Sequence, residues 1–213
     1  MKRLFDVFVS AVVLVAVSPL LLVVSVAIVA DSGFPVFFSQ ERVGRGFRRF
    51  RLRKFRTMRT GTPGSSITVA GDSRITGIGR TLRKSKLDEI PQFWNVLRGE
   101  MSVVGPRPEV QEYVGLYRER YRKVLSVRPG ITDLASIHFR NEEAILAASE
   151  DPLREYRERV LPMKLDLADR YLETQSFYRD FAIIARTAKV VLRGSRGGLR
   201  SDESRLSLSQ PRD

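Results

Sequence analysis

The longest apolar stretch of the chain covers residues 7–30, VFVSAVVLVAVSPLLLVVSVAIVA, which carry no charged side chain. An α-helix rises about 1.5 Å per residue, so a stretch of this length can cross a hydrocarbon core of about 30 Å. It is too long for the apolar part of a signal peptide, and no small-residue cleavage site closes it before Asp31. The pattern therefore predicts a membrane segment.

The topology of this segment depends on its middle and on its flanks. Ser18-Pro19 interrupts the stretch, where proline removes a helical hydrogen bond and clashes with the preceding turn. Lys2 and Arg3 precede the segment, and a dense run of arginines and lysines follows it in residues 42–56. The positive-inside rule draws both flanks to the cytoplasm. A re-entrant helix hinged at Ser18-Pro19 satisfies both features, and an ordinary kinked transmembrane helix is the alternative.

After this segment the pattern changes to that of short strands. Residues 35–40 (PVFFSQ) are aromatic and β-prone, and residues 47–58 (FRRFRLRKFRTM) alternate apolar with basic side chains. The Gly44-Arg45-Gly46 turn lies between them, so a small β-hairpin is predicted. Residues 60–74 are rich in Gly, Ser and Thr and predict a loop.

Helical spacing reappears beside an acidic pair. The apolar stripe with this spacing consists of Leu87, Ile90, Trp94, Leu97 and Met101. Asp88, Gln92 and Asn95 form a polar row on a neighbouring face. Pro91 either kinks this helix or begins a new one, which places the acidic pair at a helix junction.

The remaining segments predict helices and turns. Residues 102–109 (SVVGPRPE) and 128–133 (RPGITD) predict rigid turns. Between these turns, residues 109–124 predict a helix. Residues from 194 onward are rich in Ser, Arg and Gly and predict disorder. A last amphipathic helix, which suits a membrane interface or a protein core, presents on one face Phe177, Phe181, Ile184, Ala188 and Val191.

Composition narrows the choice of partners. The 213 residues include 37 Lys and Arg against 24 Asp and Glu, a formal net charge of +13. This excess indicates an anionic partner, which is nucleic acid, a phosphate-rich substrate or an acidic membrane surface. The absence of cysteine excludes disulfides and thiolate metal sites. The single histidine, His138, argues against a Ser-His-Asp triad and against a zinc cluster.

Two motifs introduce candidate chemistry. Asp88-Glu89 follows a basic run, and such a pair is either solvated or a nucleophile with an acid/base or metal-positioning neighbour. Arg107 lies between the prolines of residues 105–108 (GPRP), which suits bidentate binding of a diphosphate, although a structural turn with an exposed arginine is the simpler interpretation. The basic residues 48–56 suit nucleic acid or anionic lipid, and the nearby membrane segment favours lipid, so no nucleic-acid partner is expected.

Several stretches within residues 2–192 carry a family resemblance: KRLFDVFVSAVVLVAVSPLLL, PVFFSQERVG, KFRTM, KLDEIPQFWNVLRGEMSVVGPRPE, RPGITDLASI and ILAASEDPLREYRERVLPMKLDLADRYLETQSFYRDFAII. Together they resemble the bacterial sugar transferase family, the monotopic phosphoglycosyl transferases that begin glycan assembly on a polyprenyl phosphate. One departure from the family pattern is the short connection between Gly44 and Phe47, which leaves the contacts near it undefined.

The resemblance implies a reaction and a set of site residues. Asp88 would attack the β-phosphate of a nucleotide diphosphate sugar, usually a UDP-sugar, giving an aspartyl-phosphosugar and a free nucleoside monophosphate. Polyprenyl phosphate, such as undecaprenyl phosphate, would then accept the phosphosugar. Glu89 would complete the dyad, Mg²⁺ would bind at Asp88, and Arg83 and Arg107 would hold phosphate, with Lys54 a looser match. The sequence selects neither the sugar nor the pathway.

The resemblance also implies an architecture. It is a mainly α (α+β) fold, in which a re-entrant N-terminal membrane helix, amphipathic interfacial helices and a small β-hairpin form a membrane-resting catalytic domain. Residues 1–31 would be the membrane helix hinged at Ser18-Pro19, residues 32–193 the cytoplasmic phosphoglycosyl transferase domain, and residues 194–213 a disordered tail. The protein would be located at the bacterial inner membrane and would bind its lipid bilayer. The resemblance leaves open whether the protein forms a homodimer. The alternative to an enzyme is a membrane-anchored basic scaffold that binds lipid or a partner protein.

Overall fold

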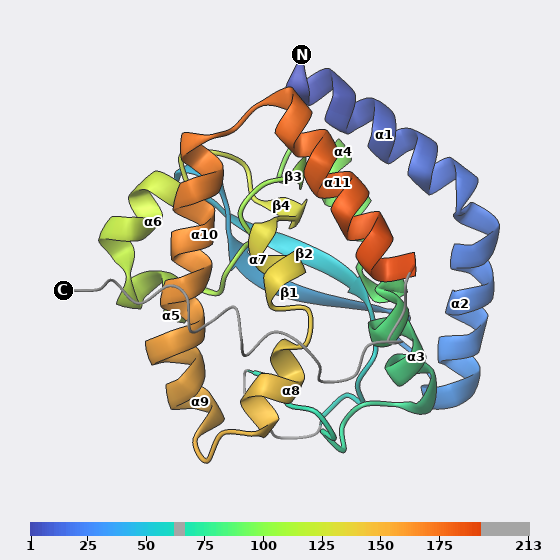
Figure 1. The fold of residues 1–213 in the computed structure, drawn as a ribbon. Coiled ribbons are helices and arrows are strands. Elements are labelled where there is room, and N and C mark those ends of the chain that lie inside the picture. The colour runs from blue at the N-terminus through green and yellow to red at the C-terminus, as the bar shows by residue number, and fades with distance from the viewer. Residues whose placement is uncertain (62–66, 193–213) are drawn as a thin grey trace.

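The computed structural model describes residues 1–61 and 67–192 and is mainly helical, as expected, with a β-hairpin near its centre (Figure 1). The helices are α1 (Lys2–Ala16), α2 (Ser18–Ser32), α3 (Gly77–Ser85), α4 (Gln92–Leu97), α5 (Gln111–Leu116), α6 (Arg118–Val124), α7 (Leu134–His138), α8 (Glu142–Ala147), α9 (Pro152–Glu155), α10 (Leu161–Glu173) and α11 (Phe177–Leu192). The strands are β1 (Phe37–Val43), β2 (Arg49–Phe55), β3 (Ser102–Val104) and β4 (Gly130–Thr132). The predicted tail from residue 194 and part of the predicted loop 60–74 lie outside the described residues.

The predicted hairpin is confirmed. β1 and β2 pair antiparallel, with Phe37 opposite Phe55 and Val43 opposite Arg49, and one 3₁₀ turn, Arg45–Phe47, joins them. The alternation in β2 has the expected effect over residues 49–53, because Phe50 and Leu52 are buried while the arginines that flank them are exposed. This orientation leaves the arginines of β2 on the surface and its apolar side chains in the core, while Lys54 is only partly exposed.

A second, parallel pair of strands was not predicted. Both segments expected to be turns contain short strands, β3 and β4, which pair with Ser102 opposite Gly130 and Val104 opposite Thr132. The backbones approach closely here, since a Cβ atom on Gly130 would lie 2.1 Å from the amide nitrogen of Gly105. Only glycine fits such a contact, so these glycines permit strand pairing and do not merely form turns.

The region after the acidic pair differs from the predicted stripe. Pro91 begins a new helix, α4, which was one of the two predicted alternatives. The apolar stripe is not continuous in the structure, because Trp94 is 48% exposed and Met101 lies beyond the helix, where it is fully buried. The buried face of α4 instead carries Gln92 and Asn95. The side-chain amide of Asn95 is buried because it forms hydrogen bonds with the backbone of β2 at residues 51 and 53.

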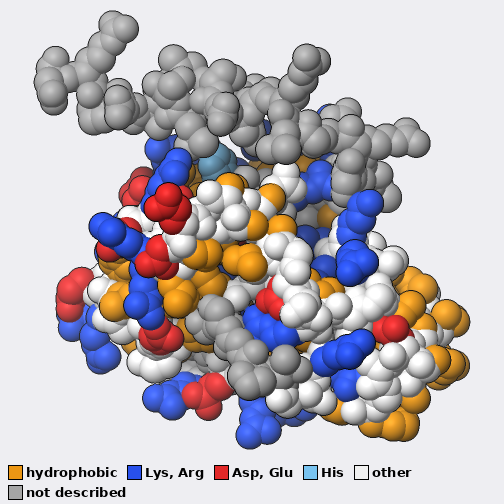
Figure 2. Space-filling view, turned by 90° about the horizontal axis from the view of Figure 1, so that it is seen from below, with side chains coloured by type: hydrophobic (Ala, Val, Ile, Leu, Met, Phe, Trp, Pro, Cys, Tyr) orange, Lys and Arg blue, Asp and Glu red, His pale blue; other side chains and the backbone are white. Residues whose placement is uncertain are grey.

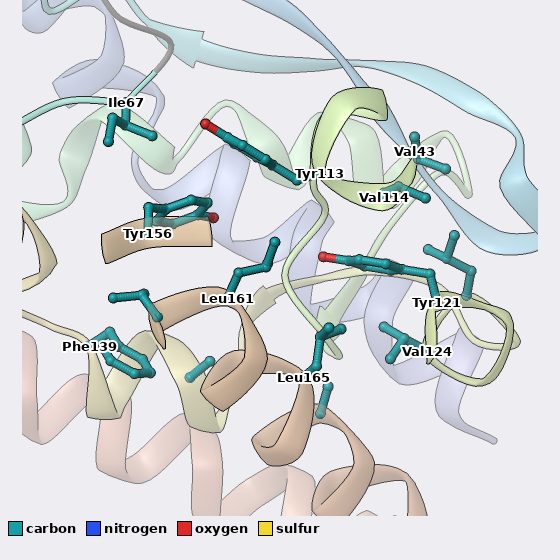
Figure 3. Close-up of a cluster of buried hydrophobic side chains, with 14 of the residues drawn as sticks. Val43, Ile67, Tyr113, Val114, Tyr121, Val124, Phe139, Tyr156, Leu161 and Leu165 are labelled. Carbon is teal, nitrogen blue, oxygen red and sulfur yellow. The ribbon is translucent and has the colours of Figure 1, made fainter. Parts of the chain in front are cut away.

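Three buried hydrophobic clusters connect these elements. The largest joins β1, α5, α6 and α10 around Val43, Tyr113, Tyr121 and Leu161, whose side chains converge in Figure 3. The predicted helix 109–124 contributes two of these elements, because it breaks at Tyr117 into α5 and α6. A second cluster lies between β2, α4, β3, α10 and α11. The third joins α2 to β2 and α3 through Val24, Ile28, Phe55 and Leu82.

The apolar N-terminal stretch forms two helices bent by 61° relative to each other, and they run along one side of the molecule (Figure 1). Within residues 1–61 and 67–192, no single helix is both long and apolar enough to cross a bilayer, whereas the bent pair α1 and α2 together is, by length and composition alone. Much of the outer surface of this pair is apolar and exposed, and Figure 2 shows hydrophobic side chains gathered at the edge where α2 lies. The exposed large hydrophobic residues of the pair are Leu4, Val7, Phe8, Val12, Val15, Leu20, Leu22, Val23 and Val26.

Both ends of this bent pair are anchored to the rest of the protein. At the start of α1, Arg3 donates to the carbonyl oxygens of Val96 and Leu97, and Asp6 is buried against β3. At the end of α2, Arg56 donates to the carbonyl oxygens of residues 33 and 34. The two ends of the apolar stretch therefore contact the same folded body.

Candidate active site

A change in backbone geometry positions the acidic pair at the predicted helix junction. α3 ends at Ser85, and Lys86, which follows it, has a left-handed conformation with φ of 60°. A 3₁₀ turn, Leu87–Glu89, then leads to Pro91 and α4. Asp88 is only 5% exposed. Neighbouring residues of such a turn point in different directions, so the two carboxylates occupy different surroundings.

Glu89 is the centre of a cluster of opposite charges. Lys54, from β2, places its Nζ atom 2.8 Å from Oε1 of Glu89. Arg107 grips the same carboxylate with both terminal nitrogens, at 2.5 Å to Oε1 and 3.3 Å to Oε2. Burial alone would raise the pKa of Glu89, but Arg107 and Lys54 outweigh it and hold that pKa well below its ordinary value. Glu89 is therefore a fixed negative charge.

The pKa of Asp88 is shifted in the opposite direction from that of Glu89. Burial raises its pKa above the ordinary value and Glu89 adds to the effect, while Lys54 is the cation that opposes it most. Lys86 and Arg83 oppose it as well. The Oδ1 atom of Asp88 is buried and has no hydrogen-bond partner among the residues that the structure describes. A desolvated carboxylate oxygen with no partner is available for a reaction or for a cation.

The loop that carries Arg107 is anchored at both of its ends. The amide nitrogen of Arg107 donates to Oδ2 of Asp133 at 3.1 Å, and Asp133 also caps the N-terminus of α7. On the other side, buried Glu109 accepts hydrogen bonds from the hydroxyl of Tyr156 at 2.5 Å and from Arg42 at 3.1 Å. Sequence reasoning assigned no role to Asp133 or Glu109, although both lie within the stretches that carry the family resemblance.

Arg83 lies on α3 but does not bind the acidic pair. Its Nε atom donates to Oε1 of Glu143 at 3.1 Å, and a second nitrogen bonds the same oxygen. α3 packs directly on the backbone of Thr57, because a Cβ atom on Gly79 would lie 2.1 Å from the Thr57 carbonyl oxygen. The structure thus brings Lys54, Arg107 and Glu89 together, and it pairs Arg83 with a carboxylate that no sequence signal identified.

The predicted hinge residues lie at the junction of α1 and α2. Ser18 and Pro19 begin α2, directly after the bend, and the hydroxyl of Ser18 donates to the carbonyl oxygen of Val15 at 2.8 Å. Proline at a first helical turn forfeits no hydrogen bond, which explains why the chain bends here without losing helical structure on either side.

Asp88 fits a Mg²⁺ site of the kind that a substrate completes. The described part of the chain contains no group of three or more acidic, histidine or cysteine side chains that could hold a metal alone. Mg²⁺ commonly binds one or two carboxylates and takes its remaining ligands from substrate phosphates and water. Both oxygens of Glu89 are engaged by cations, so the free Oδ1 of Asp88 is the available ligand.

Comparison with known proteins identifies the family. A family model described as bacterial sugar transferase matches residues 1–194. The chain belongs to the bacterial sugar transferase family. This confirms the family resemblance found from the sequence, and it places the acidic pair and its cationic partners within a bacterial sugar transferase.

Curated relatives of this bacterial sugar transferase match at similar levels of identity. A UDP-N-acetylgalactosamine-undecaprenyl-phosphate N-acetylgalactosaminephosphotransferase of Aeromonas hydrophila is 35% identical over 200 residues, 91% of this chain and 44% of the relative. A UDP-glucose:undecaprenyl-phosphate glucose-1-phosphate transferase of Caulobacter vibrioides is 36% identical over 196 residues, 90% of this chain and 69% of the relative. An undecaprenyl-phosphate galactose phosphotransferase of Salmonella typhimurium is 32% identical over 210 residues, 91% of this chain and 40% of the relative.

Two facts follow from these matches. The chain spans less than half the length of the Aeromonas and Salmonella relatives. The three names specify different sugars, N-acetylgalactosamine, glucose and galactose, at nearly the same identity. Overall similarity to these relatives therefore does not select a sugar for this protein.

Proposed function

We propose that this protein transfers a phosphosugar from a nucleotide diphosphate sugar, most simply a UDP-sugar, to a polyprenyl phosphate such as undecaprenyl phosphate. The observation that carries the proposal is the buried Asp88 carboxylate, which has a free oxygen and lies beside the cluster of Glu89, Lys54 and Arg107. The names of the relatives support this reaction class, because each specifies transfer of a sugar phosphate to undecaprenyl phosphate.

The chemistry has two substitutions at one phosphorus atom. An oxygen of ionised Asp88 attacks the β-phosphorus of the donor, the bond between that phosphorus and the bridging oxygen breaks, and the nucleoside monophosphate leaves with the electron pair. An oxygen of the polyprenyl phosphate then attacks the same phosphorus, which frees the Asp88 carboxylate and gives the polyprenyl diphosphate sugar. No proton has to be supplied in either step, because each leaving group departs as a stable anion.

The residues around Asp88 suit phosphoryl transfer because they place charges at fixed positions around the carboxylate. Phosphoryl transfer depends mainly on alignment and on neutralising the oxygens around phosphorus. Glu89 holds Lys54 and Arg107 at fixed positions, and the low pKa of Glu89 suits this role better than that of a proton donor at neutral pH. Mg²⁺ bound at Asp88 and the diphosphate would supply further charge neutralisation.

The membrane arrangement follows from the anchoring of the bent pair. We propose that α1 and α2 form a re-entrant, bent helix in the cytoplasmic leaflet of the bacterial inner membrane, with the catalytic body on the cytoplasmic face. A helix that crossed the bilayer would separate its ends by about 30 Å of hydrocarbon. Arg3 and Arg56 tie the two ends of the helix pair to the same folded body, which supports a re-entrant pair whose ends lie on the same side of the membrane. A site at this level would reach the phosphate of a membrane-embedded polyprenol.

Release of nucleoside monophosphate from a panel of UDP-sugars, measured with and without polyprenyl phosphate, tests the reaction. We expect covalent labelling of the wild-type protein by donor carrying a labelled β-phosphate, and none in Asp88→Asn. Asp166→Asn is a matched control, since Asp166 is an exposed aspartate of α10. Normal turnover by Asp88→Asn would refute the mechanism. Salt-sensitive lipid binding without consumption of any donor would favour the basic scaffold instead.

The topology has an independent test, because the chain has no cysteine of its own. One cysteine is inserted directly after Met1 and another replaces Arg45, each in a separate variant. Both should react with a membrane-impermeant maleimide from the cytoplasmic side only. Labelling from opposite sides would establish an ordinary transmembrane helix.

A further inference from the structure

A buried amide next to the acidic pair carries a donor that no described residue uses. Gln92, at the start of α4, is 1% exposed, and its Nε2 atom has no hydrogen-bond partner within residues 1–61 and 67–192. Proteins rarely bury a donor in this way, because the group loses its bonds to water and gains none in return. An unpaired buried donor therefore calls for an explanation.

A second buried amide on the same helix shows what a structural amide looks like. Asn95 is fully buried, its Oδ1 accepts from the amide nitrogen of Arg53 at 3.1 Å, and its Nδ2 donates to the carbonyl oxygen of Arg51 at 2.8 Å. The Nδ2 atom also donates to Glu100 at 2.6 Å. Asn95 thus joins α4 to β2, whereas Gln92, three residues earlier, contributes no such bond through Nε2.

The position of Gln92 relative to Asp88 provides the explanation. Ile90 and Pro91 both have helical torsions, with φ of −55° and −58°, so the turn at Asp88 continues into α4 without reversing direction. Both side chains are buried, Asp88 at 5% and Gln92 at 1% exposed, so both face the interior about one helical turn apart. Among the described residues, the acceptor Oδ1 of Asp88 and the donor Nε2 of Gln92 both lack a partner, and the two are not bonded to each other. A third group that engages both would satisfy the site.

We propose that Gln92 binds the phosphoryl group that is transferred, with Nε2 donating a hydrogen bond to a non-bridging oxygen of the phosphorus that Asp88 attacks. This inference rests on the proposed function, in which that phosphorus becomes bonded to Asp88. The phosphoryl oxygens then lie within one helical turn of Gln92. A neutral amide stabilises these oxygens without adding a positive charge beside Asp88, and an added charge would weaken the carboxylate as a nucleophile.

The test compares stability and rate in the same variants, in the full chain reconstituted in lipid nanodiscs. Gln92→Met preserves length and volume but removes the donor, and Asn95→Leu is the matched control. We expect Gln92→Met to melt at or above the wild-type temperature, because it removes an unsatisfied buried group. Its covalent labelling rate by saturating UDP-sugar should fall roughly 10- to 100-fold, the usual effect of one hydrogen bond to a charged oxygen. Asn95→Leu should instead melt at a lower temperature.

Only the combination of unchanged or raised stability with a reduced labelling rate supports the proposal. A lower melting temperature of Gln92→Met, with or without loss of activity, would mean that the amide has a structural partner such as a buried water, and it would overturn the proposal. An unchanged labelling rate would overturn it too. If wild-type protein uses no donor at all, the proposed function itself fails, an outcome distinct from an active wild type with an equally active Gln92→Met.

Discussion

Replacing Glu89 with glutamine tests whether this carboxylate organises the site. The substitution removes the negative charge to which Lys54 and Arg107 are paired, while it preserves the shape of the side chain. The Glu89 side chain is 12% exposed, and those of Lys54 and Arg107 are 22% and 30% exposed. Removing one member of a buried ion pair costs about 3–5 kcal/mol, and partial exposure of the cations reduces this to about 2–4 kcal/mol. For a chain of this length that corresponds to a melting temperature lower by about 5–15 °C.

The single tryptophan provides the readout for this experiment. Trp94 lies on α4, immediately after the junction that holds Glu89, so its fluorescence reports on unfolding of this region. Glu41→Gln is the matched control, because it removes a carboxylate from an ion pair with Arg49 in which both side chains are more than half exposed. The control should melt with the wild type. Equal melting temperatures for wild type and Glu89→Gln would refute the assignment of Glu89 as the anchor of the cations.

The effect of Glu89→Gln on the melting temperature should depend on pH in a defined way. The pKa of Glu89 is depressed in the folded protein, so its stabilising contribution is complete above the unfolded pKa of about 4.3 and is lost as the pH falls through the folded pKa. The difference in melting temperature between wild type and Glu89→Gln should therefore be constant from pH 6 to 8 and disappear only in strong acid. A difference that changes between pH 6 and 8 would show that another group is responsible.

Three further predictions concern the surroundings of the site. Asp88→Asn should abolish covalent labelling and raise the melting temperature, because it removes a carboxylate whose pKa burial raises; a lower melting temperature would contradict this. Gly79→Ala should cost about 1–3 kcal/mol in chemical denaturation, since its Cβ atom would overlap a backbone carbonyl, whereas Gly115→Ala, which meets no atom within 4 Å, should stabilise by about 0.5–1 kcal/mol. Glu143→Gln should lower the donor KM by about 2- to 5-fold by releasing Arg83, and an unchanged KM would remove Arg83 from phosphate binding.

The elements predicted correctly from sequence are those with local signals. The hairpin was visible because β2 alternates apolar and basic residues and a glycine-containing turn precedes it. The last amphipathic helix was visible because its apolar spacing persists over four turns. β3 and β4 gave no such signal, since strands of three residues are too short to show a period and their partners are distant in sequence.

The candidate site divides in the same way. Asp88 and Glu89 were found because they are adjacent in the sequence and lie in a stretch that resembles a known family. The pairing of Glu89 with Lys54 and Arg107 joins three separate segments, so no local pattern could reveal it. The burial of the polar row on α4 was not predicted, because the spacing placed the row only on a neighbouring face, and nothing in the sequence showed that the edge of β2 would need hydrogen-bond partners.

The anchoring of α1 and α2 has a practical consequence for protein production. Deleting α1 and α2 to obtain a water-soluble fragment would remove Asp6, which accepts from the buried amide of Val103, and Ser32, whose hydroxyl accepts from the buried guanidinium of Arg56. Each orphaned polar group costs about 1–3 kcal/mol, in a fold whose total stability is on the order of 5–15 kcal/mol. The deletion would also expose Phe55 and Leu82. Detergent or nanodisc work on the intact chain is therefore the sound route, because α1 and α2 pack into the buried clusters of the fold.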